Sequence, residues 1–448
     1  MTTSRPQSPD DASHSFGALL KIGPFRNLWI AQLLSQTSHN GIHYVELLMI
    51  AQLTESTGHV GLMILAFTLP AVLFSAVAGV VVDRFPKRRV LVASNALRVL
   101  LALSYIVALK LFSGAPLIVW VYTATFLTSA IAQFFAPAEG ATIPLLVGRK
   151  RLITANSLFN LTITGTQVLG LLVLFPLIIK LGNRWFGTGN GIEFSFALVA
   201  LMYSIAVLLL RTLPPDPVLA RVTRTGDATE SALQRGWQEM REGLSFVKRT
   251  PTLWVAMINL SLTATIAYIL AMVAPNYASN ILRVSQEDAI YIFAPAGIGM
   301  LLGTFVIPRI GHAIRRETIS SSGLALQGGM LTLMALVATR LTDQTTLLTW
   351  ATMALAFSIG LGFAMIGIPA QTMLQERTPH TVRGRVFAAQ YLLANSLAIV
   401  PMLVAGTIAD RVGIPPVVLT TGLIIMIVAF WSFFWATRHR HEAHSSLI

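Results

Sequence analysis

The sequence contains no cysteine among its 448 residues, and charged residues make up only 11% of the chain. Without cysteine there is no disulfide framework and no thiolate chemistry. The phosphate-binding pattern G-x-x-x-x-G-K-[ST] is also missing, so we expect no work driven by ATP. Soluble domains usually carry about 25% charged residues. The low charge therefore argues against a water-soluble protein.

Apolar residues are abundant instead, at 54% of the chain, and they gather in long runs. A run of about 20 apolar residues crosses the hydrocarbon core of a membrane as a helix. The expected fold is all-α, a polytopic membrane protein whose twelve transmembrane helices form two pseudo-symmetric six-helix bundles. The predicted spans lie near residues 27–52, 60–82, 90–111, 116–137, 152–180, 193–210, 252–280, 289–308, 318–339, 346–370, 384–409 and 414–436.

The positive charges lie in alternate gaps between these spans. Of the 32 Lys and Arg residues, 25 fall in one alternate set of gaps and 6 in the other. Cytoplasmic loops carry this excess, so both termini are predicted to be cytoplasmic. The net charge of +13 is thus explained by membrane topology, and we expect no nucleic-acid partner.

One long polar interruption divides the chain at residues 212–251, which open with Pro214-Pro215-Asp216-Pro217. Between Glu230 and Arg249, five apolar residues then recur at spacings of 3 and 4, namely Leu233, Trp237, Met240, Leu244 and Val247. This predicts an amphipathic helix on the inner membrane face, either a tether or a regulatory element. We expect an N-terminal bundle at 1–211 with a disordered cytoplasmic tail at 1–23, a cytoplasmic linker at 212–251, and a C-terminal bundle at 252–448 with a short basic tail.

Two segments echo each other, GVVVDRFPKRR from Gly79 to Arg89 and GTFVIPRIGHAIRR from Gly303 to Arg316. The first resembles the loop 2–3 signature of the major facilitator superfamily, with Pro86 where a glycine is usual. The stretches FRNLWIAQLLSQ, FFAPAEGATIPLLVGRKRLITANSL and GWQEMREGLSFVKRTPTL resemble the branch that contains macrolide-efflux proteins, the enterobactin exporter and lysophospholipid transporters. The resemblance covers residues 20–436.

This resemblance implies proton-driven transport by alternating access, often export, with a proton gradient in place of any cofactor. It also implies a single-chain protein of a bacterial plasma or inner membrane. Two six-helix repeats are expected to rock about a central site. The Gly-Pro-rich stretch of antiporters is missing from LTITGTQVLGLLVLF in the fifth span. Export and import therefore both stay open.

The signature and its surroundings are expected to form a conformational latch. In the resemblance, Gly79 allows close helix packing, Asp83 accepts hydrogen bonds, and basic residues supply cytoplasmic charge. Arg98 lies inside a span and is expected to pair with Asp83 or Glu139, or else to bind an anionic substrate. The predicted latch comprises Gly79, Asp83, Arg84, Arg88, Arg89, Arg98 and Glu139.

A polar stripe runs along the first span, formed by Gln32, Gln36, His39, His43 and Glu46 at spacings of 4, 3, 4 and 3. Such spacing places all five side chains on one helix face. We expect this face to line a wet central cavity, with Glu46 and His43, and His39 near them, as candidates for proton coupling. The alternative is that they contact substrate or neighbouring helices without titrating. A metal site is not expected, because His39 and His43 lack the glutamate of H-E-x-x-H.

Further amides, hydroxyls and phenols lie on three other spans and suit an amphipathic organic substrate. Together with Gln32 and Gln36, the candidates for lining the cavity are Asn156, Asn160, Thr164, Gln167, Asn259, Tyr268, Gln390, Tyr391 and Asn395. Many such groups join helix to helix instead, at about 0.6 kcal/mol for each contact. Asn276 belongs to the same series.

The predicted function is a secondary transporter, by proton-coupled efflux of a hydrophobic or amphipathic drug, siderophore or metabolite. The partners would be that substrate, protons and membrane lipids. A lysophospholipid or other lipid transporter is the alternative, and a membrane sensor of the same fold is a weaker one. We expect no enzyme, since no paired nucleophile and base is present.

Overall fold

The computed structural model describes residues 16–148, 151–187, 189–215, 238, 241–310, 314–379 and 382–438. Every regular element in these ranges is helical, as expected where lipid leaves the backbone no partner outside its own segment. The elements are α2 (Phe16–Leu20), α3 (Gly23–Thr54), α4 (Thr57–Arg84), α5 (Lys87–Leu111), α6 (Ala115–Val147), α7 (Leu152–Leu169), η2 (Gly170–Leu174), α8 (Phe175–Phe186), α9 (Asn190–Arg211), α11 (Pro251–Asn280), η3 (Gln286–Asp288), α12 (Ala289–Ile310), α13 (Arg316–Arg340), α14 (Thr345–Arg377), α15 (Arg383–Val412) and α16 (Ile414–Arg438).

The helices group into two compact units by their contacts. Unit 1 contains the described residues up to Met49 and those from Ala66 to residue 215. Unit 2 contains Ile50–Leu65 and the described residues from 238 onward. The end of α3 and the start of α4 therefore belong to unit 2, although the N-terminal half of the sequence supplies them.

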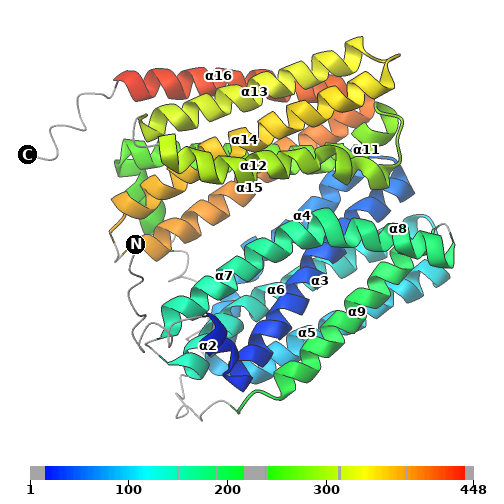
Figure 1. Cartoon of the computed structure of the whole chain (residues 1–448), viewed down its shortest axis with the longest axis vertical. Coiled ribbons are helices and arrows are strands. Elements are labelled where there is room, and N and C mark those ends of the chain that lie inside the picture. The colour runs from blue at the N-terminus through cyan, green and yellow to red at the C-terminus, as the bar shows by residue number, and fades with distance from the viewer. Residues whose placement is uncertain are drawn as a thin grey trace, which may run out of the picture. The chain divides into compact units, whose positions relative to one another are not determined.

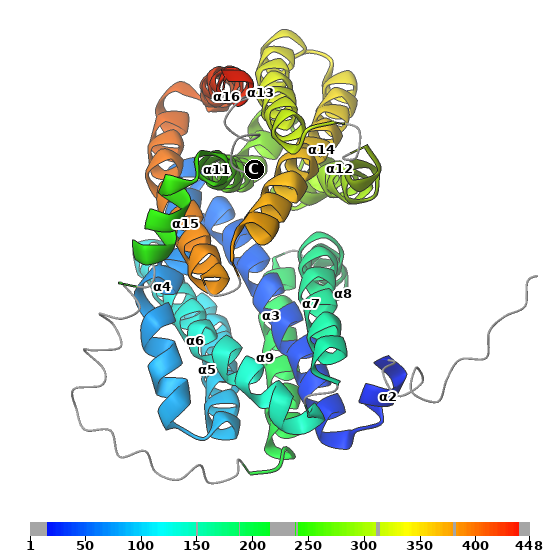
Figure 2. The same cartoon turned by 90° about the vertical axis from the view of Figure 1, so that its left-hand side faces the viewer.

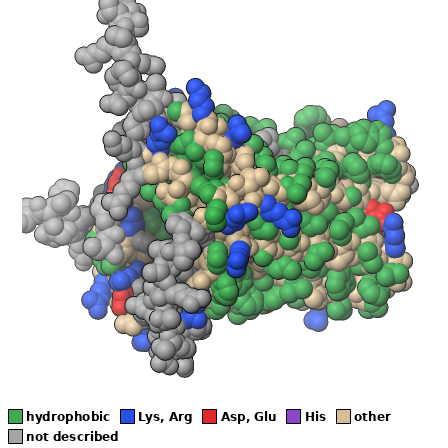
Figure 3. Space-filling model, turned by 90° about the horizontal axis from the view of Figure 1, so that it is seen from below, with side chains coloured by type: hydrophobic (Ala, Val, Ile, Leu, Met, Phe, Trp, Pro, Cys, Tyr) green, Lys and Arg blue, Asp and Glu red, His purple; other side chains and the backbone are tan. Residues whose placement is uncertain are grey.

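Within unit 2, α16 lies along α13, and α12 lies along α14 (Figures 1 and 2). Close approach of α12 and α14 depends on glycine, because a Cβ on Gly360 would lie 1.8 Å from the carbonyl oxygen of Ala296. Within unit 1, α5 packs on both α6 and α9. Figure 3 shows that hydrophobic side chains cover much of one face, with a small group of Lys and Arg side chains near its middle.

Ten helices in the described ranges are long and apolar enough to cross a membrane. The predicted spans near 27–52 and 152–180 are helical too, but they are not among these ten. The first is α3, which carries the polar stripe, and the second is interrupted by the π-helical turn η2. For these two segments, membrane crossing stays a prediction.

The tail expected to be disordered at 1–23 is helical in part, and that prediction was wrong for α2. Leu19 has no exposed surface and joins the core of unit 1 with Phe25 and Leu28. Burial of an apolar side chain in such a core offsets the conformational entropy that is lost when the short helix becomes ordered. Residues 1–15 lie outside the described ranges.

The described part of the amphipathic segment before α11 packs on the core of unit 2. Its position on the inner membrane face stays a prediction. Of its five apolar positions, Leu244 and Val247 are described, and both contact the core of unit 2. Arg385 on α15 also donates to Glu242 at 2.8 Å. The other three positions, Leu233, Trp237 and Met240, lie outside the described ranges.

Candidate functional site

Two residues of the polar stripe on α3 are fully buried in unit 1. Glu46 has no exposed surface and Gln32 is 1% exposed, whereas Gln36, His39 and His43 are half-buried. The helix continues without a break through all five positions, so their shared face follows directly from the sequence spacing. The structure therefore brings the predicted proton-coupling residues together.

Glu46 is held by two side chains, one on its own helix and one on a neighbour. Its Oε2 lies 2.9 Å from Nδ1 of His43, one turn earlier on α3. Its Oε1 accepts a hydrogen bond from the hydroxyl of Tyr105 on α5. The Tyr105 hydroxyl also lies 3.0 Å from Oγ1 of Thr125 on α6. Three helices thus converge on one buried carboxyl.

The two histidines of the stripe form a short aromatic series. The rings of His39 and His43 meet edge to face with centroids 4.5 Å apart. His43 also stacks on Phe67 of α4 at 4.7 Å. These contacts set the orientation of the His43 ring, whose Nδ1 faces Glu46.

A π-helical turn lies against α3 beside the histidines, and the sequence did not predict it. Gly170 opens η2, and a Cβ there would lie 3.5 Å from the carbonyl oxygen of Thr37. Phe175 follows η2 and packs so tightly on Gly41 that a Cβ at that glycine would overlap its ring. Such turns often mark functional sites in helices. In the sequence, Gly41, Gly170 and Pro176 were the residues that could have indicated this turn and its packing on α3.

Arg98 is the second buried charge of unit 1, at 3% exposed. Its guanidinium lies over the rings of Phe135 at 5.2 Å and Tyr203 at 5.6 Å. It interacts electrostatically with Glu139 on α6, which is 8% exposed. Glu139 was one of the two partners predicted for Arg98, and a direct ion pair between them stays a prediction. The side chain of Asp83, the other, lies outside the described part of the chain.

A separate link ties Arg98 to α3. Asn95 lies one turn earlier on α5, and its side-chain oxygen is 3.4 Å from Arg98. The amide nitrogen of Asn95 donates to Ser35 on α3 at 2.9 Å. Ser35 lies between Gln32 and His39 in the sequence, so the helix that carries the polar stripe also holds Arg98 in place.

The remaining latch residues lie on the surface of unit 1. Arg84 and Arg89 are exposed, and Arg88 donates to the carbonyl of Arg211 at the end of α9. Gly79 differs from its predicted role, since a Cβ there would meet no described atom within 4 Å. Close helix packing at Gly79 is therefore not seen in the described part of unit 1.

The amide series of the fifth span forms an exposed edge on α7. Asn156, Asn160 and Gln167 are all exposed, so they are not packed inside unit 1. The side chain of Thr164 is outside the described part. Their role in lining a substrate cavity stays a prediction.

In unit 2, several residues that were predicted to line the cavity form hydrogen bonds between helices. Asn259 is 2% exposed and donates to Ser320 on α13 at 3.0 Å. Tyr268 donates to Asn395 on α15 at 2.7 Å. By contrast, Gln390 is half-buried, and Tyr391 is 61% exposed. For Gln390 and Tyr391, contact with a substrate stays a prediction.

A polar cluster at one end of unit 2 was missed by the sequence analysis. The carboxylate of Asp410, near the end of α15, accepts hydrogen bonds from Ser56 Oγ at 2.6 Å, Thr57 N at 2.6 Å and Gly58 N at 3.0 Å. Asn276 on α11 adds a bond to Thr57 Oγ1 at 3.0 Å. Asp410 therefore caps the N-terminus of α4.

Comparison with known proteins agrees with this architecture. The family model described as Major Facilitator Superfamily matches residues 28–401. The lysophospholipid transporter LplT of Photorhabdus laumondii is 23% identical and aligns over 82% of this chain and 84% of its own length. Macrolide efflux protein A of Streptococcus pyogenes is 21% identical and aligns over 90% of this chain and 94% of its own.

A crystal structure of the nucleoside transporter NupG has a similar fold, with a TM-score of 0.66 at 14% identity. The match covers 92% of this chain and 98% of the NupG chain. Both named relatives come from the branch that the sequence motifs indicated, and the family match extends over most of the helices. The chain is therefore a multi-pass membrane transporter that belongs to the Major Facilitator Superfamily.

Proposed function

We propose that this transporter exports a hydrophobic or amphipathic small molecule in exchange for protons, by alternating access. The observation that supports it best is Glu46, a carboxyl without exposed surface that contacts both His43 and Tyr105. An ionised side chain at bilayer depth costs about 2.5–3.5 kcal/mol on insertion scales. Such a residue is expected to have a function.

The contacts of Glu46 suit the uptake and release of one proton. His43 is 14% exposed, so it connects the buried carboxyl with the surroundings. With its Nδ1 2.9 Å from Glu46, a proton can pass between the two groups without movement of α3. Tyr105 donates to the other carboxyl oxygen and keeps it oriented when the proton leaves.

Coupling requires that the proton bind one conformation better than the other. In this conformation Glu46 has no exposed surface and is enclosed by α3, α5 and α6. The cycle we propose includes a second conformation in which water reaches Glu46 and its proton is exchanged. An inward proton gradient would then drive the cycle in one direction and carry the substrate the other way.

The substrate class rests on the side chains available for contact. The exposed positions Asn156, Gln167 and Tyr391 offer amides and a phenol without fixed charge. Relatives are named for macrolide efflux and for lysophospholipid transport, and both compounds combine apolar and polar parts.

The test uses proteoliposomes with an imposed pH gradient and two radiolabelled probes, a macrolide and a lysophospholipid. We expect Glu46→Gln to lose gradient-driven transport, while exchange of labelled for unlabelled probe without a gradient is kept. Glu193→Gln is the matched control, because Glu193 pairs with Lys110 at 3.5 Å away from the Glu46 cluster. Gradient-driven flux in Glu46→Gln equal to that of the wild type would refute proton coupling through this residue.

The second candidate function is transport of a lysophospholipid between leaflets. It is supported by the 23% identical lysophospholipid transporter. Movement of the lysophospholipid probe but not the macrolide would favour it. Saturable binding of both probes with no flux of either would instead favour a sensor.

A further inference from the structure

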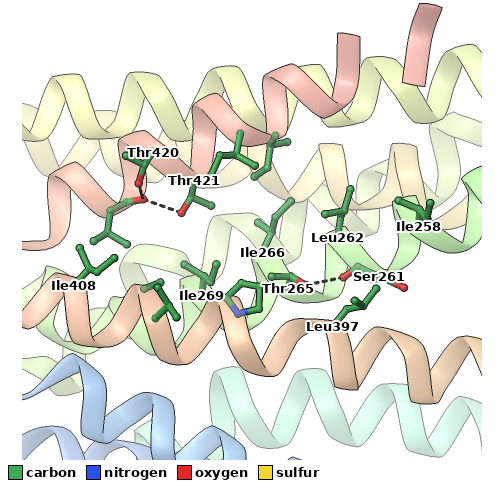
Figure 4. A pocket seen from close by; sticks show the side chains of 16 residues that line it. Ile258, Ser261, Leu262, Thr265, Ile266, Ile269, Leu397, Ile408, Thr420 and Thr421 are labelled. Atoms are coloured by element: carbon green, nitrogen blue, oxygen red, sulfur yellow. Dashed lines mark hydrogen bonds between the residues drawn. The ribbon is translucent and has the colours of Figure 1, made fainter. Parts of the chain in front are cut away.

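An apolar groove of about 470 Å³ runs through unit 2 between α15 and α16 (Figure 4). Its floor is α11, where Ser261, Ile266 and Ile269 are buried. Its walls are more open, since Leu397 on α15 is 48% exposed and Ile424 on α16 is 59% exposed. None of the described residues that line the groove is charged. The volume is that of a small-molecule site.

The hydroxyl groups in the groove are engaged by the backbone of their own helices. Thr265 donates to the carbonyl of Ser261 at 2.9 Å, and Ser261 to that of Met257 at 2.9 Å. Thr420 and Thr421 both donate to the carbonyl of Val417, at 3.0 and 2.8 Å. These four donors are therefore already satisfied, and the surface left for a ligand suits hydrocarbon.

The length of the groove matches one leaflet of a membrane. On α11 its lining runs from Ile258 to Ile269, and on α15 from Leu397 to Ile408. Eleven residues of helix rise about 16 Å at 1.5 Å per residue. Half of the roughly 30 Å hydrocarbon core is about 15 Å. An extended chain of leaflet length can lie along the groove.

The walls come together at one end. Only Gly413 separates the end of α15 from the start of α16, and its φ of +87° needs glycine. Because two helices joined by one residue begin side by side, we expect the groove to be narrowest at this end. This geometry favours one hydrocarbon chain over the two chains of a bilayer phospholipid.

A polar hollow of about 420 Å³ follows the groove along the same two helices. Ile408 ends the groove on α15, and the next two residues, Ala409 and Asp410, line the hollow. Its described lining has two carboxyl groups, on Glu55 and Asp410, and neither lysine nor arginine. The Asp410 carboxylate is engaged in the cap of α4, whereas Glu55 is exposed. The negative charge of the two groups suits a polar or cationic head group.

We propose that the groove binds the hydrocarbon tail of a single-chain amphiphile, with its head group at the Asp410 hollow. The inference rests on the amphipathic substrate class proposed above and assigns the tail to helices of unit 2. The site is open to the bilayer through the exposed walls, so the amphiphile enters from the membrane.

The absence of cysteine allows single-cysteine variants without background labelling. Ile424→Cys places a small fluorophore in the groove. Ile427→Cys is its matched control, since Ile427 is 68% exposed on the same helix and does not line the groove. Leu397→Cys and Val400→Cys make the same comparison on α15, where Val400 is 66% exposed.

The full-length protein in phosphatidylcholine nanodiscs is titrated with lysophosphatidylcholine that carries a nitroxide on its chain. We expect saturable quenching at positions 424 and 397, reversed by unlabelled lysophosphatidylcholine, and only linear quenching at 427 and 400. Ala405→Phe fills the groove and should reduce the saturable component at least fivefold. Thr421→Phe fills it from α16 and serves if the first variant does not fold.

Linear quenching at all four positions would overturn the proposal, and so would saturable quenching that survives both filling variants. Equal saturation by a two-chain nitroxide phospholipid would show an ordinary lipid site instead. Saturable quenching without flux of the same lysophospholipid would support the tail site while refuting lipid transport. Flux with only linear quenching would refute the site alone.

Discussion

Unit 1 and unit 2 differ in the polar side chains that they bury. In the described part of the chain, the acidic and basic side chains that are less than 10% exposed are Glu46, Arg98 and Glu139, all in unit 1. Unit 2 buries neutral groups, such as Asn259 and Gln327. Charge at bilayer depth is costly and is kept for function, whereas amides and hydroxyls also serve helix packing. The buried charges therefore lie in unit 1, whereas the apolar groove lies in unit 2.

The strongest way to break this comparison is to remove the buried charge of unit 1. We expect Arg98→Met to lower the free energy of unfolding by about 3 kcal/mol, because the variant loses the contacts of Arg98 with Phe135 and Tyr203 and removes the positive charge near the buried Glu139. Thermal unfolding of the purified protein measures the change. Arg84→Met, at an exposed position, should change stability by less than about 0.5 kcal/mol.

The double variant Arg98→Met with Glu139→Gln separates charge pairing from packing. If the two residues form a pair, the double variant is more stable than Arg98→Met alone. If the stability losses of the two single variants simply add in the double variant, the stability comes instead from the contacts of Arg98 with Phe135 and Tyr203.

The next largest effect is expected in the packing of unit 2. Gly360→Ala places a Cβ 1.8 Å from the carbonyl oxygen of Ala296, so α12 has to move away from α14. Overpacking of this kind costs about 1–3 kcal/mol. Gly367→Ala is the control on the same helix, because a Cβ there meets no described atom within 4 Å. Equal unfolding temperatures for the two variants would contradict the close approach of the helices.

The smallest effect concerns the cap that Asp410 provides for α4. Asp410→Ala removes acceptors for Ser56, Thr57 and Gly58, and loss of a helix cap costs about 1 kcal/mol. Thermal unfolding measures this loss. Asp343→Ala is the control, because Asp343 is an exposed acidic residue in the same unit. A loss as large as that of Arg98→Met would show that unit 2 also depends strongly on a charge.

Local sequence patterns predicted much of the architecture. The ends of the predicted spans near 252–280 and 289–308 lie within two residues of α11 and α12. The spacing of the polar stripe correctly placed Glu46 and His43 on one face of α3. Both results depend on residues close in the chain, where helix periodicity applies directly.

The predictions that failed or were not made concern contacts between distant segments. Tyr105 lies 59 residues from Glu46, and Asp410 lies 353 residues from Thr57. No local pattern links such pairs. The helical turn at Leu19 was missed for the same reason, because the core of unit 1 stabilises it.

Length, hydropathy and the placement of Lys and Arg were enough to determine that this chain is a helical membrane protein, because each helix must satisfy its own backbone in lipid. They also determined which side chains share a helix face. Only the tertiary structure decided which faces meet, and so which carboxyl is enclosed, which amide joins two helices and where a groove remains. Those outcomes depend on side-chain shape where remote helices pack, which no single segment encodes.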